Sequence, residues 1–220
     1  MLSSRAIAII EEMALIDSPG PPMWARRLVE AVCLRYHVRQ PHLRWRKALC
    51  HSSTAFETLG DYNPRTQTMI VHEAATQREN RIDLLHELAH HIYFLRTGRD
   101  DHSEGFWRYC WTLHLLYGAR LHSAVLSEFS YMARSEKVLM AMGVRMSCQA
   151  RVAAELGRTL RKNAAMRIRI RRLNASLGEL RTGRKKLSAR RDLRKMKEAQ
   201  AHTEKAVARH ALAYKRVAKA

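Results

Sequence analysis

Two histidines and a glutamate near the middle of the chain have the residue types and the spacing of a metal-dependent hydrolytic site. They are His86, Glu87 and His90, in the pattern His-Glu-x-x-His. Residues four positions apart lie on the same face of a helix, so the two imidazoles can bind one metal ion. Glu87 is next to the first imidazole and can accept a proton from a metal-activated water molecule. The pattern predicts a zinc site in which Glu87 is the general base.

A catalytic zinc ion also needs a third protein ligand and one open coordination position. We predict that His102 is this ligand, because it follows His90 by twelve residues and comes after Gly98, where the chain can turn back toward the metal. Two carboxylates remain as alternatives, since some His-Glu-x-x-His enzymes take the third ligand from a glutamate on a later helix. These alternatives are Glu104 and Glu128.

Two predicted helices would position the three histidines. The spacing of apolar residues predicts a helix over residues 77–96, with Gly98 as its C-cap. Residues 100–103 are polar and form a connection, and Ser103 can cap a second helix that runs to about residue 117. His102 would therefore lie immediately before the second helix, where a tight reversal can bring it over the metal.

The segments that precede these helices predict a small sheet. Apolar and basic residues alternate over residues 43–47, and residues 68–71 have the highest β-propensity in the chain. Residues 53–58 are a weaker strand candidate, and residues 60–64 are typical of a turn. With a further helix predicted over residues 24–36, the sequence indicates an α+β fold with a small antiparallel sheet of about three strands.

Two stretches of the sequence resemble the SprT-like (Spartan-type) zinc metallopeptidases and the related WLM peptidases. These stretches are His-Glu-Leu-Ala-His-His at residues 86–91 and Asp-His-Ser-Glu-Gly-Phe-Trp at residues 101–107. The Gly-Asp-Tyr at residues 60–62 and the strand at 68–71 are similar to the turn and strand before the family's active-site helix. The resemblance covers about residues 23–117, and it departs from the family's His-Gly-Pro at positions 102–104, which are His-Ser-Glu here.

The resemblance implies a zincin-like core, a bound Zn²⁺ ion and the hydrolysis of peptide bonds in a protein or peptide substrate. By this resemblance His86, His90 and His102 are the metal ligands, and Glu87 is the catalytic base. It also implies that the substrates are proteins bound or crosslinked to DNA. Many bacterial members carry a cysteine-rich zinc ribbon after the core, whereas a basic segment follows here.

Positive charge is concentrated in the last third of the chain. The 220 residues have a net charge of +20, and residues 151–220 contain 22 Lys and Arg against 5 Asp and Glu, a net charge of +17. We therefore predict two domains, a metallopeptidase domain over residues 1–150 and a basic, mostly helical extension over residues 151–220. Such a density of positive charge favours nucleic acid as a partner. Tyr214 is the only aromatic residue after position 150, which favours contacts to the phosphate backbone over base stacking.

Composition excludes several other classes of protein. No stretch approaches the ~18 apolar residues of a membrane span, and no secretory signal is evident, so we expect a cytoplasmic protein without a membrane partner. The four cysteines are far apart and form no Cys-x-x-Cys pair. The leading hypothesis is a zinc metalloendopeptidase. The alternative is a non-catalytic nucleic-acid-binding or assembly protein with a metallopeptidase-like fold.

Overall fold

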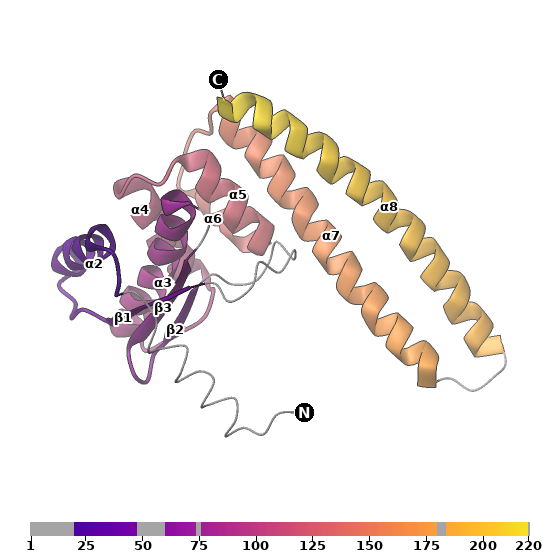
Figure 1. Cartoon of the computed structure of the whole chain (residues 1–220), viewed down its shortest axis with the longest axis horizontal. Helices are drawn as coiled ribbons and strands as arrows, with labels where there is room; N and C mark the ends of the chain where they lie inside the picture. The colour runs from indigo at the N-terminus through magenta and orange to yellow at the C-terminus, as the bar shows by residue number, and fades with distance from the viewer. Residues whose placement is uncertain (1–19, 48–59, 74–75, 180–183, 220) are drawn as a thin grey trace. The chain divides into compact units, whose positions relative to one another are not determined.

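The computed structural model describes residues 20–47, 60–73, 76–179 and 184–219, and it divides into two compact units, Met1–Arg120 and Leu121–Ala220. The described part is α+β and mostly helical, with a small mixed sheet of three strands (Figure 1). None of the described helices combines the length and the apolar character needed to cross a membrane. The predicted fold class, α+β, is confirmed.

The first unit contains the sheet and three helices. In chain order its elements are α2 (Met23–Tyr36), β1 (His42–Lys47), β2 (Gly60–Asn63), β3 (Thr68–Glu73), α3 (Gln77–Thr97) and α4 (Glu104–Leu116). Helix α3 contacts α2, α4, β2 and β3, so it is the centre of the unit. Its apolar side chains fill the core, with Leu84, Leu85, Leu88 and Ile92 fully buried.

The sheet differs from the predicted one in strand direction. Its order is β1-β3-β2, and β1 pairs with β3 in parallel while β2 pairs with β3 in antiparallel. The prediction of an antiparallel sheet is therefore wrong for the β1–β3 pair. Side chains alternate in the same way along parallel and antiparallel strands, so the pattern over residues 43–47 could not fix the direction. The twenty residues between β1 and β3 are enough for the crossover that a parallel pair requires.

The segment predicted as a turn at residues 60–64 is largely strand β2. The turn comes later, at residues 64–67, where the Asn63 Oδ1 atom accepts hydrogen bonds from the backbone N–H groups of Arg65 and Thr66. Gln67 closes this turn with a positive φ of 50°. The weaker strand candidate at residues 53–58 lies outside the described residues.

Helix α3 has a strong signal at each end. Thr76 caps its N-terminus, since its side chain accepts from the backbone N–H of Glu79 while the Glu79 carboxylate accepts from the backbone N–H of Thr76. Gly98 ends the helix with a φ of 70°, a conformation that glycine adopts without strain. The predicted helix over residues 77–96 and its glycine C-cap are confirmed.

The second unit is helical in its described part. It contains α5 (Leu121–Tyr131), α6 (Ala133–Ala141), α7 (Cys148–Glu179) and α8 (Arg184–Lys219). Helices α7 and α8 lie side by side as an antiparallel hairpin (Figure 1). The Gln149 side chain donates to the carbonyl of Val217 at the base of the hairpin, and Arg167 pairs with Glu204 at 2.9 Å farther along it.

The two units divide thirty residues before the predicted domain boundary at residue 150. Helix α5 packs on α7, and a Cβ atom added at Gly157 would lie 3.1 Å from both the Leu126 carbonyl oxygen and the Phe129 Cβ atom. The absence of a side chain at Gly157 thus permits close contact between these helices. The net charge of residues 151–220 indicates a basic helical segment, but it gives no information about which helices pack together.

Candidate metal centre

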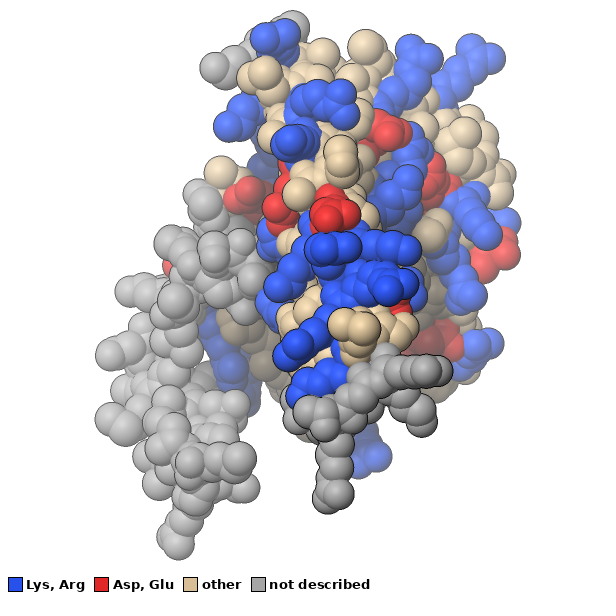
Figure 2. Space-filling model, turned by 90° about the vertical axis from the view of Figure 1, so that its right-hand side faces the viewer, with Lys and Arg blue, Asp and Glu red and all other residues tan. Residues whose placement is uncertain are grey.

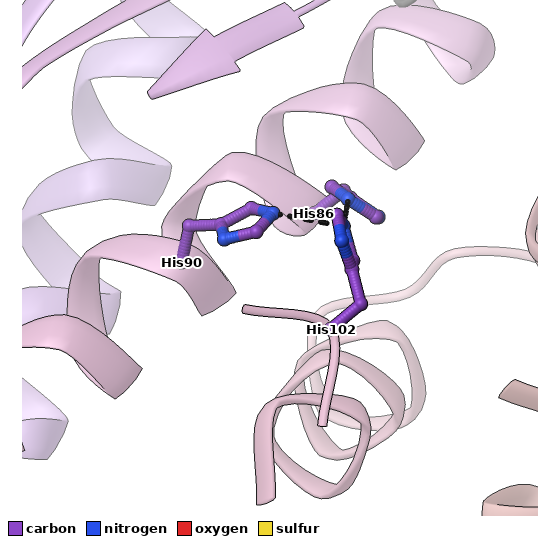
Figure 3. A group of neighbouring side chains, drawn as sticks. All are labelled: His86, His90 and His102. Carbon is purple, nitrogen blue, oxygen red and sulfur yellow. Dashed lines mark hydrogen bonds between the residues drawn. The ribbon is translucent and has the colours of Figure 1, made fainter. Parts of the chain in front are cut away.

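Three histidine side chains converge at one point in the first unit. His86 and His90 lie one turn apart on α3, and His102 lies just before α4 (Figure 3). The Nε2 atom of His102 is 3.2 Å from Nε2 of His86 and 3.1 Å from Nε2 of His90. The structure therefore brings together all three residues predicted as metal ligands.

The separations between these nitrogen atoms fit a tetrahedral metal ion. Zinc–nitrogen bonds of ~2.0–2.1 Å at tetrahedral angles place two ligand nitrogens about 3.3 Å apart. The two measured separations, 3.2 and 3.1 Å, are close to that value. All three imidazoles also present the same ring atom, Nε2, which is a ligand atom for Zn²⁺. Three histidines leave one position of a tetrahedral ion for water or substrate.

Asp100 lies behind His90 and fixes its ring. The Oδ1 atom of Asp100 is 2.8 Å from Nδ1 of His90, so Nδ1–H donates to the carboxylate and Nε2 keeps its lone pair for a metal. A carboxylate in this position also makes the imidazole a stronger ligand. Burial, helped by the nearby carboxylates of Asp61 and Asp101, raises the pKa of Asp100.

The connection between α3 and α4 is held by hydrogen bonds on both sides of His102. The Asp101 carboxylate accepts from the backbone N–H of Ser103 and from the Arg99 guanidinium. The Ser103 hydroxyl and the Tyr93 hydroxyl are hydrogen-bonded at 2.7 Å, which joins the start of α4 to α3. These contacts return the chain after Gly98, so His102 is fixed above the α3 histidines.

Two buried aromatic side chains of α4 form the wall behind the three imidazoles. The ring centroid of Phe106 lies 4.2 Å from that of His90 and 4.7 Å from that of His102. Trp107 packs against His86 and His102, with centroids 5.7 and 5.6 Å apart. Both aromatic residues are fully buried. Their apolar surface restricts the rotation of the imidazoles and lowers the local dielectric constant, which strengthens charge interactions at the site.

Glu87, the predicted base, is buried and lies against the first residue of β2. A Cβ atom added at Gly60 would be 2.7 Å from Cγ of Glu87 and 2.8 Å from its Oε1 atom. A side chain at position 60 would displace the Glu87 carboxyl group from this place, so glycine at position 60 makes room for it. Strand β2 thus limits where the Glu87 carboxylate can lie.

The two carboxylates that remained as alternative ligands are not part of the cluster of three histidines. Glu104 is exposed and forms an ion pair with Arg108, one turn later on α4, at 2.8 Å. Glu128 is buried on α5, in the second unit. The cluster of three ligand atoms within the first unit contains His102.

His91, the next residue after the motif, belongs to the core of the unit. It is fully buried, its Nε2–H donates to the Arg39 carbonyl at 2.7 Å, and its Nδ1 accepts from the Tyr62 hydroxyl at 3.0 Å. Burial lowers the pKa of His91, so the ring stays neutral and keeps this hydrogen-bond pattern. These contacts tie α3 to β2 and to the segment before β1.

Sequence reasoning missed Asp100 and Gly60 as parts of the site. The sequence predicts Asp100 only as part of a polar connection, although a carboxylate two residues before a predicted ligand is a signal for a partner of a metal-binding histidine. The sequence predicts Gly60 as a turn residue, and no local signal indicates that a distant helix places Glu87 against it.

Comparison with protein-family models, curated proteins and solved structures finds no match for this chain.

Proposed function

We propose that this protein is a zinc-dependent endopeptidase with a zincin-like core, similar to the SprT-like metallopeptidases. The observation that carries the proposal is the convergence of three Nε2 atoms at 3.1–3.2 Å, with a neighbouring glutamate on the same helix. His86, His90 and His102 would hold the ion. When bound there, Zn²⁺ supplies Lewis-acid activation of a water molecule and of the substrate carbonyl.

The protein side chains have distinct roles in this proposal. The Glu87 carboxylate accepts a proton from the attacking water and later delivers it to the departing amine nitrogen. Asp100 holds His90 with Nδ1–H outward and Nε2 toward the metal. The apolar wall of Phe106 and Trp107 excludes bulk water from one side of the imidazoles. Hydrolysis of an amide fits this combination of three neutral ligands and one general base.

The test is cleavage of fluorescently labelled casein by the metal-loaded full chain. We expect zinc-dependent cleavage by the wild type and a loss of at least ~100-fold in Glu87→Gln, because general-base catalysis contributes about 10²–10⁴-fold. Glu30→Gln, which removes an exposed carboxylate on α2, is the matched control and should cleave at the wild-type rate. Cleavage that survives Glu87→Gln, or a wild type that binds no zinc, refutes the proposal.

A second property, binding to nucleic acid, is proposed for the α7–α8 hairpin. Residues 167–204 of the sequence contain 13 Lys and Arg against 4 Asp and Glu. Among the described residues of this range, the exposed cations include Arg169, Arg171 and Arg172 of α7 and Arg190, Arg191 and Arg194 of α8. On the face shown in Figure 2, Lys and Arg side chains are more prominent than Asp and Glu. When Lys and Arg side chains neutralise phosphates, counterions are released from the nucleic acid, and this release supplies binding affinity that does not depend on the nucleotide sequence. This property also favours the alternative of a non-catalytic nucleic-acid-binding protein, which the casein assay separates from a peptidase.

Salt dependence measures how many phosphates the hairpin contacts. The variant Arg169→Gln/Arg171→Gln/Arg172→Gln removes three exposed cations of α7, and Arg27→Gln/Arg35→Gln/Arg39→Gln removes three exposed cations of the first unit as a control of equal charge. For binding to a short DNA duplex, we expect the α7 variant to reduce the slope of log affinity against log salt by about 2.7. Equal slopes in both variants would show that net charge alone drives binding.

A further inference from the structure

Tyr93 of α3 and Ser103 at the start of α4 form a hydrogen bond beside the third predicted ligand. The two hydroxyl oxygens are 2.7 Å apart, and Ser103 directly follows His102 in the chain. Tyr93 is 5% exposed and lies three residues after His90, on the same side of α3. One helix therefore carries two of the predicted ligands and, about one turn farther along, the side chain that holds the segment containing the third.

The side chain of Ser103 does not have the role that serine usually has at this position. Ser103 is the N-cap residue of α4, and its carbonyl accepts from the backbone N–H of Trp107. A serine N-cap commonly accepts a hydrogen bond from a backbone N–H of the first turn, which stabilises the helix. Within the described first turn of α4, the Ser103 hydroxyl makes no such bond and contacts Tyr93 instead. The contact with α3 thus replaces a local cap.

Gly105 makes room for the Tyr93 ring. A Cβ atom added at Gly105 would lie 2.9 Å from Cε2 of Tyr93 and 3.5 Å from its hydroxyl oxygen. Gly105 is in the first turn of α4 and does not have a positive φ, so its backbone conformation does not require glycine. Alanine would favour the helix at this position. The close packing of Tyr93 on α4 therefore accounts for a residue that helix propensity disfavours.

We propose that Tyr93 is a positioning residue, which holds His102 over the two histidines of α3 through Ser103. This inference rests on the proposed function, because it requires that the three histidines bind a metal ion. The Asp101 carboxylate supports the connection locally, by accepting from the backbone N–H of Ser103. Tyr93 ties the connection to the helix that carries the other two ligands, so it fixes the spacing between His102 and that helix. Loss of the Tyr93 hydroxyl should therefore weaken metal binding although every ligand remains.

The experiment is the measurement of Zn²⁺ affinity, by competition with a chelator, together with the denaturant midpoint of the metal-free full chain. Tyr93→Phe removes one hydroxyl, and Zn²⁺ affinity should fall about three- to tenfold, the factor that one hydrogen bond supplies. The midpoint should move little, because the released Ser103 hydroxyl can turn to cap α4. Tyr109→Phe is the matched control. It removes a hydroxyl from a tyrosine of α4, whose ring centroid is 6.3 Å from that of Tyr93, and should bind Zn²⁺ like the wild type.

A double-mutant cycle separates positioning of His102 from a general effect on the fold. In the His102→Ala background, measured with a weaker chelator, Tyr93→Phe should cause no further loss of Zn²⁺ affinity, because the ligand through which Tyr93 acts is absent. Gly105→Ala should lower Zn²⁺ affinity as Tyr93→Phe does, since the added methyl group displaces the Tyr93 ring.

The results that would overturn the inference are distinct from failure of the proposed function. Equal Zn²⁺ affinity in Tyr93→Phe and wild type, with or without a lowered midpoint, would show that the hydrogen bond does not position a ligand. An equal loss in Tyr109→Phe, or the same loss from Tyr93→Phe with and without His102, would assign the effect to the packing of α4. A wild type that binds no Zn²⁺ would refute the proposed function, and the inference with it.

Discussion

Replacement of Asp100 by asparagine should weaken metal binding while leaving all three ligands in place. The Asp100 carboxylate accepts a hydrogen bond from Nδ1–H of His90 at 2.8 Å. An asparagine can turn its NH₂ group toward the ring and present a donor where His90 needs an acceptor, and it removes the negative charge that strengthens the imidazole as a ligand. Substitution of a residue that hydrogen-bonds to a metal ligand typically lowers metal affinity about 10- to 100-fold, which corresponds to about 1.4–2.7 kcal/mol of binding free energy.

The assay is competition between the protein and a chromophoric chelator for Zn²⁺ at neutral pH. Glu104→Gln is the matched control, because Glu104 is a carboxylate close to His102 in sequence but pairs with Arg108. We expect Asp100→Asn to lose affinity in the stated range and Glu104→Gln to match the wild type. Unchanged affinity in Asp100→Asn would refute the reasoning about His90, and a large loss in Glu104→Gln would restore that carboxylate as a ligand.

Three further predictions concern the base, the core and the hairpin. Gly60→Ala places a Cβ atom 2.7 Å from Cγ of Glu87 and should displace the catalytic carboxylate. Casein cleavage should therefore fall well below the wild-type rate, while Zn²⁺ affinity stays within about twofold of wild type. Parallel losses of cleavage and of Zn²⁺ affinity would contradict a specific effect on the base. Tyr62→Phe leaves Nδ1 of the buried His91 without its donor and should lower the free energy of unfolding by about 1–3 kcal/mol in a denaturant titration; an unchanged midpoint would show that this bond does not stabilise the fold. Arg158 donates a hydrogen bond to the Glu155 carboxylate at 2.7 Å, which lowers the pKa of Glu155. The contribution of this pair to stability is therefore present above the unfolded-state pKa of about 4.3 and is lost as pH falls through the folded-state pKa. The stability difference between wild type and Glu155→Gln should shrink in acid, and a constant difference from neutral pH to acid would exclude this linkage.

The parts of the site that follow from local geometry could be predicted from the sequence. His86 and His90 share a face because helix geometry places residues four apart together, and Gly98 marked the point where the chain turns back toward them. Each of these predictions depends on a few neighbouring residues. The structure has the same arrangement, with His102 completing the cluster.

Features that depend on contacts between distant segments could not be predicted. The direction of β1 depends on a crossover, and the place of Gly60 depends on a glutamate 27 residues away. Close contact at Gly157 packs α5 against α7, so α5 belongs to the second unit. The distribution of charge along the sequence does not indicate this boundary. The contact between Cys110 and His86 likewise depends on how α4 packs on α3.

The central claim is that three imidazoles hold one metal ion, and elemental analysis after dialysis against Zn²⁺ tests it most directly. Wild type should retain about one zinc per chain. His102→Ala, which removes the ligand that joins the two helices at the site, should retain much less at the same free Zn²⁺ concentration. Equal zinc content in wild type and His102→Ala, or none in either, would contradict the account.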